Sequence, residues 1–166
     1  SVLRQDPDIV MVGEIRDQET AETAAQAALT GHILLSTLHT NDSATAIPRL
    51  IDLGGEPFLI SSVLSASVAQ RIARRICDTC KEEYEPTPLV KENVMNVLEP
   101  LLPSKYTKGE PMKLFRGKGC TECNFSGYLG RVAIFEVLKI TPSINKLILS
   151  SASAKEIEQQ GLKESL

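Results

Sequence analysis

Two short apolar runs, Ile9–Val12 and residues 33–35, stand out near the start of the chain. Both are rich in β-branched residues or leucine and neither alternates with polar residues, which is typical of central strands in a parallel sheet covered on both faces. The segment between them, residues 17–30, has the length of one crossover helix. The pattern therefore predicts an α/β fold that begins with a strand, a helix and a parallel strand.

The crossover segment has alanines at helical spacing and residues suited to both helix ends. Asp17 can cap the N-terminus through its side chain, and Gly31 can end the helix. Small side chains would let this helix pack closely on the sheet. The predicted packing face comprises Ala21, Ala24, Ala25 and Ala28.

Two further helices are expected after the second apolar run. The first covers residues 43–53, with Asn41 or Asp42 as its N-cap. The second covers residues 57–74, with Pro57 in its first turn. Arg71, Arg74 and Arg75 would then lie near the end of this helix, either as ordinary helix-end charges or at a subunit interface.

The chain becomes charged and rich in proline from Cys77 onward. The predicted elements are a helix at residues 90–102, a short strand at 113–115, a strand at 132–140, a helix at 141–149 and a last helix that opens with a capping box at residues 153–156.

Composition narrows the functional classes. The chain has 166 residues, of which 42% are hydrophobic, so it can form one domain or one domain with a small module. Its net charge of −3 argues against a general nucleic-acid binder. Residues 1–7 do not resemble a signal peptide, and the apolar stretch at 58–69 is too short and too rich in serine to span a bilayer. The start without methionine indicates a fragment of a longer protein.

Each of the two apolar runs is followed by residues that can perform chemistry. Glu14 follows the first run, and Thr37 and His39 follow the second. Ligands of open α/β sheets bind at the carboxyl ends of the strands. We therefore expect Glu14, Thr37 and His39 to face one crevice.

The four cysteines form two Cys-x-x-Cys pairs, Cys77 with Cys80 and Cys120 with Cys123. Two such pairs can complete a tetrahedral thiolate site for structural zinc. The interval between them is longer than in a simple zinc ribbon, which indicates that the metal would hold the base of an inserted lobe. Two disulfides, four free thiols or one redox dithiol are the alternatives.

The motifs together resemble type II secretion and type IV pilus assembly ATPases. Residues 3–8 leading into 11–17 are similar to the Walker B box of that family, and residues 30–32 with 36–41 are similar to its histidine box. Residues 70–74, followed by the cysteines, are similar to the stretch that comes next. The resemblance implies a RecA-like ATPase domain that works as a homo-hexamer. Retraction members typically lack the cysteine insert, which favours assembly.

The resemblance also implies roles for the candidate residues. Glu14 and His39 would be catalytic, and Glu14, Thr37, His39 and Arg16 would form the binding site for ATP with Mg²⁺. Arg16 could instead set local geometry or a subunit contact. Gly13 stands where the generic motif has aspartate, so Glu14 alone would supply the carboxylate. Thr37 could instead only cap a turn, and His32 fits packing or a site role equally.

The predicted organisation is an ATPase core at residues 1–76, a zinc lobe at 77–123 and the C-terminal strand and helices of the core at 124–166. The expected partner is an inner-membrane platform protein, at the cytoplasmic face of the bacterial inner membrane, with no nucleic acid. The sequence contains no Gly-x-x-x-x-Gly-Lys-Ser/Thr loop, so the fragment alone is predicted to be inactive. The rival interpretations are a stand-alone zinc-ribbon module that binds protein or nucleic acid, and a redox protein that uses one cysteine pair.

Overall fold

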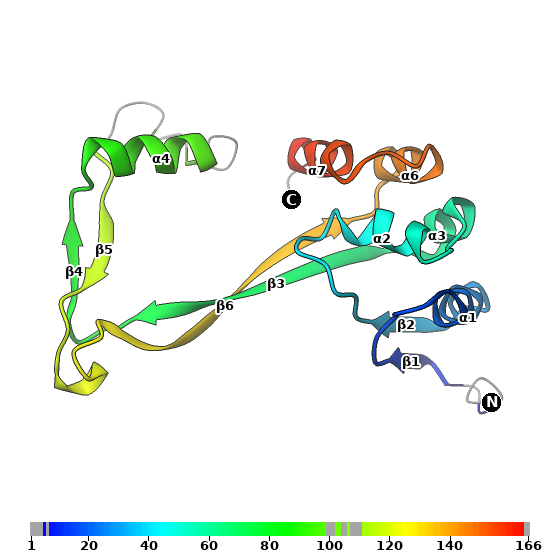
Figure 1. The fold of residues 1–166 in the computed structure, drawn as a ribbon, viewed down its shortest axis with the longest axis horizontal. Helices are drawn as coiled ribbons and strands as arrows, with labels where there is room; N and C mark the ends of the chain where they lie inside the picture. Colours follow the sequence, from blue (N-terminus) through cyan, green and yellow to red (C-terminus); the bar gives the residue numbers. More distant parts are fainter. Residues whose placement is uncertain (1–4, 6, 99–101, 104–105, 107–110, 165–166) are drawn as a thin grey trace. The chain divides into compact units, whose positions relative to one another are not determined.

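A computed structural model describes residues 5, 7–98, 102–103, 106 and 111–164 of the chain (Figure 1). The chain forms two compact units. We call Ser1–Gln70 together with Phe135–Leu166 the core unit, and Arg71–Ile134 the cysteine unit. The described elements are β1 (Ile9–Val12), α1 (Gln18–Leu29), β2 (Ile33–Ser36), α2 (Ala46–Asp52), α3 (Pro57–Val63), β3 (Ala66–Ile76), β4 (Lys81–Tyr84), α4 (Pro88–Leu98), β5 (Leu114–Gly117), a 3-10 turn (Thr121–Cys123), β6 (Tyr128–Lys139), α6 (Pro142–Leu149) and α7 (Ala154–Lys163).

The core unit begins with the predicted β1–α1–β2 arrangement. β1 and β2 pair in parallel, from Ile9 opposite Ile33 to Val12 opposite Ser36. Asp17 caps α1, since its Oδ1 accepts a hydrogen bond of 2.9 Å from the Thr20 backbone. The helix is followed by Gly31, whose φ of 95° lies in the left-handed region that glycine tolerates. These local signals were sufficient to predict the unit.

Two details of this unit differ from the sequence-based expectation. The buried alanines of α1 are Ala21, Ala24 and Ala27, whereas Ala25 and Ala28 are only half-buried. The packing face therefore follows a spacing of three residues and includes Ala27, which the prediction omitted. The prediction that both faces of the sheet are covered is also wrong for the described part of the chain.

One face of the β1–β2 sheet is open within the described residues. Met11 is 78% exposed, and Ile9, Ile33 and Leu35 are also exposed. Side chains alternate between the faces of a strand, so α1 covers only the face that carries Leu34, which packs with Ala21 and Ala24.

The main hydrophobic core of the core unit is built by four helices and one strand. It includes Ile47 of α2, Ile60 of α3 and Leu138 of β6, and the isoleucines of the last two helices are Ile144, Ile148 and Ile157. Both C-terminal helices were predicted, and both have side-chain caps. Thr141 accepts a hydrogen bond from the Ile144 backbone, and Ser153 and Glu156 form the expected capping box.

The predicted long helix at residues 57–74 is wrong beyond α3. The chain continues as β3, which pairs with β6. Ile140 donates to the Ser65 carbonyl at one end of the pair, and Cys77 donates to the Gly127 carbonyl at the other, so the strands run antiparallel. The alanine, glutamine and arginine residues of β3 have good helix propensity, but the distant partner strand overrides it. The arginines of this segment are therefore strand residues.

The helix predicted at residues 43–53 is also shorter than expected, because α2 begins only at Ala46. The residues before it form turns in which Asp42 Oδ1 accepts a hydrogen bond of 2.7 Å from the Thr45 backbone. Asp42 therefore caps a turn that leads into the helix, rather than a helix that begins at residue 43.

The cysteine unit contains an antiparallel pair, β4 and β5, and the helix α4 (Figure 1). The strand predicted at residues 113–115 begins one residue before β5 and ends two residues before its end. The prediction missed β4, whose sequence is mostly charged. Glu82 of β4 accepts hydrogen bonds of 2.7 Å from both Arg116 and Lys118, so cross-strand charges support this pairing. Residues 99–101 of the predicted helix at 90–102 lie outside the described residues.

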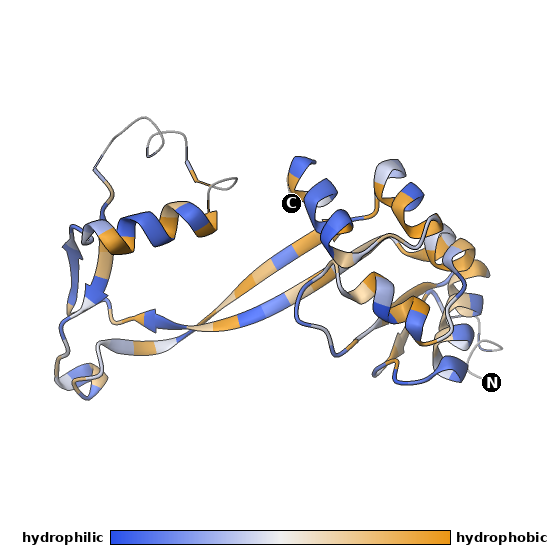
Figure 2. Cartoon of the chain, turned by 45° about the horizontal axis from the view of Figure 1, so that its top comes forward, coloured by the Kyte–Doolittle hydropathy of each residue, from blue (hydrophilic) through white to orange (hydrophobic). Residues whose placement is uncertain are grey.

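Strand β6 is longer than predicted and rich in hydrophobic residues (Figure 2). Many of these are exposed in the described chain, including Val132, Ile134, Phe135 and Val137. Among the described helices, none combines the length and the apolar character needed to cross a bilayer.

Candidate functional site

The structure brings Glu14 and His39 into contact. Glu14 follows β1 and His39 follows β2, and parallel pairing places the carboxyl ends of both strands at one edge. His39 Nε2 lies 3.0 Å from Glu14 Oε2. The two residues are separated by 25 positions in the sequence, so the contact depends on the β1–α1–β2 fold.

Thr37 forms hydrogen bonds to the backbone on both sides of Glu14. Its hydroxyl donates a hydrogen bond of 2.7 Å to the Gly13 carbonyl, and its own carbonyl accepts one of 3.0 Å from the Ile15 backbone. These two bonds continue the pairing of β1 with β2 on both sides of Glu14. The Thr37 hydroxyl therefore holds this edge together in the structure.

Arg16 shares the carboxylate oxygen that His39 contacts. Its Nε lies 2.6 Å from Glu14 Oε2. The hydrogen bond from Arg16 lowers the pKa of Glu14 below its ordinary value, and the contact with His39 lowers it further. The Glu14 side chain is 32% exposed and that of His39 is 82% exposed. Among the described residues, the other oxygen of Glu14, Oε1, has no hydrogen-bond donor, so it is available to accept one.

His39 also lines a hollow on the surface of the core unit. This cavity of about 330 Å³ is bordered by His39, Thr40, Asn41, Thr45 and Arg49. Glu14 and Thr37 are not among the residues that line this cavity. That all three residues face one crevice stays a prediction. The sequence analysis did not single out Thr40, Thr45 or Arg49.

The remaining basic candidates lie elsewhere. His32 precedes β2, at the opposite end of the strand from Thr37, and its Nδ1 lies 2.9 Å from the Thr30 hydroxyl, which favours a packing role. Arg74 and Arg75 belong to the cysteine unit. The Arg74 guanidinium lies 4.1 Å from the centre of the Tyr128 ring, and Arg75 pairs with an acidic neighbour.

A polar contact that the sequence analysis missed holds the loop after His39. Ser43 is buried, and both its backbone N–H and its hydroxyl donate to Glu136 Oε1 on β6. Ser67 of β3 donates to the Ser43 carbonyl at 2.8 Å. The signal was present, because Glu136 is a charged residue inside the apolar sequence of β6.

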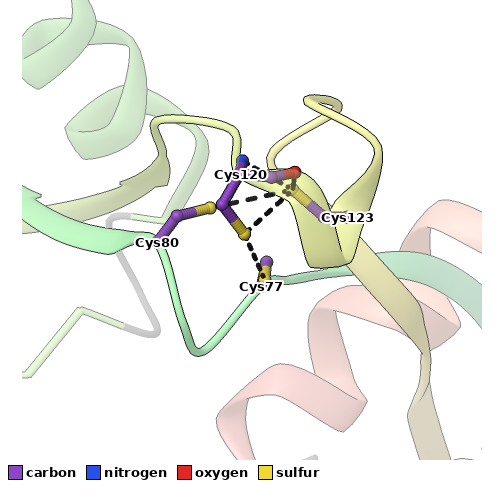
Figure 3. A group of neighbouring side chains, drawn as sticks. All are labelled: Cys77, Cys80, Cys120 and Cys123. Atoms are coloured by element: carbon purple, nitrogen blue, oxygen red, sulfur yellow. Dashed lines mark hydrogen bonds between the residues drawn. The ribbon is translucent and has the colours of Figure 1, made fainter.

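The four cysteines converge in the cysteine unit (Figure 3). Their sulfur atoms all lie within 4.8 Å of one another, and the closest pairs are 3.7 to 3.9 Å apart. Four thiolates about 2.3 Å from a zinc ion would lie about 3.8 Å from one another in a regular tetrahedron. The arrangement therefore fits one divalent metal ion bound by all four thiolates. Disulfides do not fit, because the four cysteines are free and their sulfurs are too far apart for a bond.

The backbone around the cysteines supports the thiolate form of Cys123. The N–H groups of Cys120 and Gly127 donate to Cys123 Sγ and lower the pKa of this thiol to about 6. Burial raises the pKa of Cys80 to about 11, which the N–H of Gly119 partly opposes. A metal ion requires deprotonated thiols, so the backbone favours binding at Cys123 and burial opposes it at Cys80.

Two glycines allow the chain to cross closely near this cluster. A Cβ atom on Gly117 would lie 2.1 Å from the carbonyl oxygen of Gly127. Gly127 has a φ of 75° and its N–H and C=O groups contact Cys123 and Cys77. Both positions therefore require glycine for the observed arrangement.

The fold and these two groups of residues define an α/β protein with a polar edge at parallel strand ends and a cluster of four cysteines that could hold a metal ion. A family model described as type II/IV secretion system protein matches residues 1–165. The chain belongs to this family, and the resemblance to type II secretion and type IV pilus assembly ATPases is confirmed.

Two curated relatives illustrate the match. The chain is 50% identical over 159 residues to a protein named type II secretion system ATPase E from Vibrio cholerae, covering 96% of this chain and 30% of the relative. It is 45% identical over 163 residues to the type IV pilus assembly ATPase PilB of Myxococcus xanthus, covering 98% of this chain and 28% of the relative. The chain thus spans less than a third of the length of these relatives.

Solved structures share the fold. A crystal structure of the pilus retraction motor PilT with bound ADP aligns over 96% of this chain and 32% of PilT, with a TM-score of 0.56 and 25% identity. The Legionella pneumophila ATPase DotB aligns over 98% of this chain and 32% of its own, with a TM-score of 0.56 and 22% identity.

Proposed function

We propose that this chain belongs to an ATPase that powers type IV pilus assembly or type II secretion, and that Glu14 and His39 act on ATP. The observation that carries this proposal is the hydrogen bond between these two side chains across the ends of neighbouring parallel strands. Ligands of α/β sheets bind at this edge. The names of the relatives and the family membership support the reaction class.

The proposed roles follow from the contacts of each residue. Glu14 is ionised, and its Oε1 is the acceptor that would orient the attacking water or a water on Mg²⁺. His39 would hydrogen-bond to the terminal phosphate or sense its loss. Thr37 and Arg16 would keep Glu14 in place through the bonds described above. Bound Mg²⁺ supplies positive charge that neutralises the phosphate oxygens.

The proposed organisation assigns residues 1–76 and 124–166 to a RecA-like ATPase core and residues 77–123 to a lobe held by zinc. The zinc ligands would be Cys77, Cys80, Cys120 and Cys123, whose sulfur spacing supports a tetrahedral site. The full-length protein would act as a homo-hexamer on an inner-membrane platform protein, at the cytoplasmic face of the membrane and without nucleic acid. The insert favours assembly over retraction.

The sequence contains no phosphate loop, so the proposed activity belongs to a longer protein that includes this segment. We expect the 166-residue chain alone to show no ATP turnover above a Glu14→Gln control. A stand-alone zinc-ribbon module would explain the cysteines but would give no role to the contact between Glu14 and His39.

The test is ATP hydrolysis by the longer protein with Glu14→Gln. We expect the rate to fall by about 10²-fold or more, as for the loss of a catalytic carboxylate, while binding of a fluorescent ADP analogue is retained. Glu19→Gln, which removes an exposed carboxylate from α1, is the matched control and should leave the rate unchanged. Equal turnover in Glu14→Gln and the parent protein would refute the proposed role.

A further inference from the structure

The described residues that line the hollow next to His39 all carry side chains that can donate hydrogen bonds. His39, Thr40, Asn41, Thr45 and Arg49 border this cavity of about 330 Å³, and none of them is acidic. Of these residues, Thr45 offers a hydroxyl and Arg49 a guanidinium that donate to no other group in the described part of the chain. A hollow with such donors and a fixed positive charge is suited to an anion.

The loop that forms the hollow is already held in shape without a ligand. Asp42 accepts a hydrogen bond of 2.7 Å from the Thr45 backbone, and the Thr40 hydroxyl donates to the Asp42 carbonyl at 3.2 Å. Ser43 is tied to Glu136, as described above. The Asp42 carboxylate is thus engaged with the backbone and is not among the groups that line the hollow. A preformed site loses less conformational entropy when a ligand binds.

Arg49 is the residue that gives the hollow its charge. It lies on α2, four positions after Thr45, so the two side chains share one side of the helix. Within the described part of the chain, the Arg49 guanidinium has no acidic partner and no hydrogen-bond acceptor. A guanidinium that is always charged and presents a planar fork of donors matches the oxygens of a phosphoryl group.

We propose that this hollow binds a phosphoryl group, with Arg49 as its principal ligand and Thr45 as a second donor. The inference rests on the proposed function, because the phosphoryl group would be the terminal phosphate of ATP or the inorganic phosphate released from it. His39 joins the two sites. Its Nε2 contacts Glu14, and the same side chain lines the hollow. Arg49 is therefore a binding residue at the edge where the reaction is proposed to occur.

The direct test is a titration of inorganic phosphate into the 166-residue chain, followed by the amide resonances of the loop. We expect saturable shifts at Thr40, Asn41 and Thr45. Arg49→Gln should weaken binding about tenfold or more, since it removes charge-assisted hydrogen bonds. Arg49→Lys keeps the charge but loses the fork, so its affinity should be intermediate.

The matched control is Lys146→Gln, which removes one exposed positive charge from another helix, α6. This variant should bind phosphate as the parent chain does. Unchanged amide resonances outside the loop would show that each variant is folded. Absence of saturable shifts in the parent chain, or equal weakening by Lys146→Gln and Arg49→Gln, would overturn the proposal.

Kinetics of the longer protein separate the two sources of phosphate. If the hollow holds the terminal phosphate of ATP, Arg49→Gln raises the KM for ATP. If it holds released phosphate, the variant relieves inhibition by added phosphate and leaves the KM unchanged. A variant that alters neither would overturn the link to the reaction.

This inference and the proposed function can fail separately. Phosphate binding without any effect of Glu14→Gln on turnover would remove the proposed role of Glu14 and leave the anion site. Loss of turnover in Glu14→Gln without phosphate binding in the hollow would remove only the anion site.

Discussion

Removal of the metal should unfold the cysteine unit and leave the core unit folded. The reason is the difference in buried apolar side chains between the two. In the described part of the cysteine unit, the buried hydrophobic residues are Cys77, Met112 and Cys123, and two of these are proposed metal ligands. The core unit has its own cluster of five buried isoleucines, one alanine and one leucine.

The magnitudes point the same way. Burial of one methionine side chain contributes about 1.5–3 kcal/mol. Ordering the backbone costs about 1–2 kcal/mol per residue, so this burial offsets the ordering of only a few residues. A structural zinc ion bound by thiolates contributes about 10–16 kcal/mol to folding. The metal, rather than apolar packing, is therefore expected to supply most of the stabilisation of the cysteine unit.

Hydrogen exchange before and after chelation measures this directly. We expect amides in Arg71–Ile134 to lose protection when zinc is removed, and amides of α1, α6 and α7 to keep it. Addition of zinc should restore protection and addition of magnesium should not, because magnesium prefers oxygen ligands. Full protection of the cysteine unit after metal analysis has shown the ion to be absent would refute this reasoning.

Three further predictions concern the core unit, each measured by urea unfolding monitored at α-helical amides. Ile148→Ala should lower the free energy of unfolding by about 2–5 kcal/mol because Ile148 is fully buried, whereas Leu149→Ala should lower it much less because Leu149 is 52% exposed. Equal losses in the two variants would contradict the assigned core. Ser43→Ala should lower the free energy of unfolding by about 1–3 kcal/mol, since it removes a hydrogen bond to the Glu136 carboxylate. An unchanged midpoint of urea unfolding would argue against that contact. Hydrogen bonds from Ser153 lower the pKa of Glu156 in the folded state below 4.5. The stability that the Glu156 carboxylate contributes is therefore present above that pH and is lost as the pH falls through the folded pKa. Glu156→Gln should lose less stability on acidification than the parent chain, and an identical pH profile would oppose this assignment.

Local signals predicted the elements on which the site depends. The apolar runs of β1 and β2, the cap at Asp17 and the glycine at residue 31 all act over a few residues, so the β–α–β unit could be predicted from the sequence. Its parallel pairing follows from the crossover, and this pairing brings Glu14 to His39. The spacing of the cysteines likewise predicted their cluster.

Contacts between distant segments explain what the sequence did not reveal. Strand β3 has the composition of a helix and is a strand because β6 pairs with it. The contact between Ser43 and Glu136 joins residues 93 positions apart, and the close approach of Gly117 to Gly127 exists only in the folded unit. The β1–β2 sheet was predicted to be covered on both faces, but one face is open in the described chain. The composition of a strand does not show which of its faces has a partner.

The central claim is that Glu14 and His39 act as one unit on ATP, and a double-mutant cycle in the longer protein tests it most directly. The measurement is kcat for Glu14→Gln, His39→Ala and the double variant, with nucleotide binding followed in parallel. Residues that act together are not additive, so we predict that the double variant is no more than a few-fold slower than the slower single variant. The claim would be contradicted if the fold-loss of kcat in the double variant equals the product of the two single losses. It would also be contradicted if either single variant keeps the parent kcat.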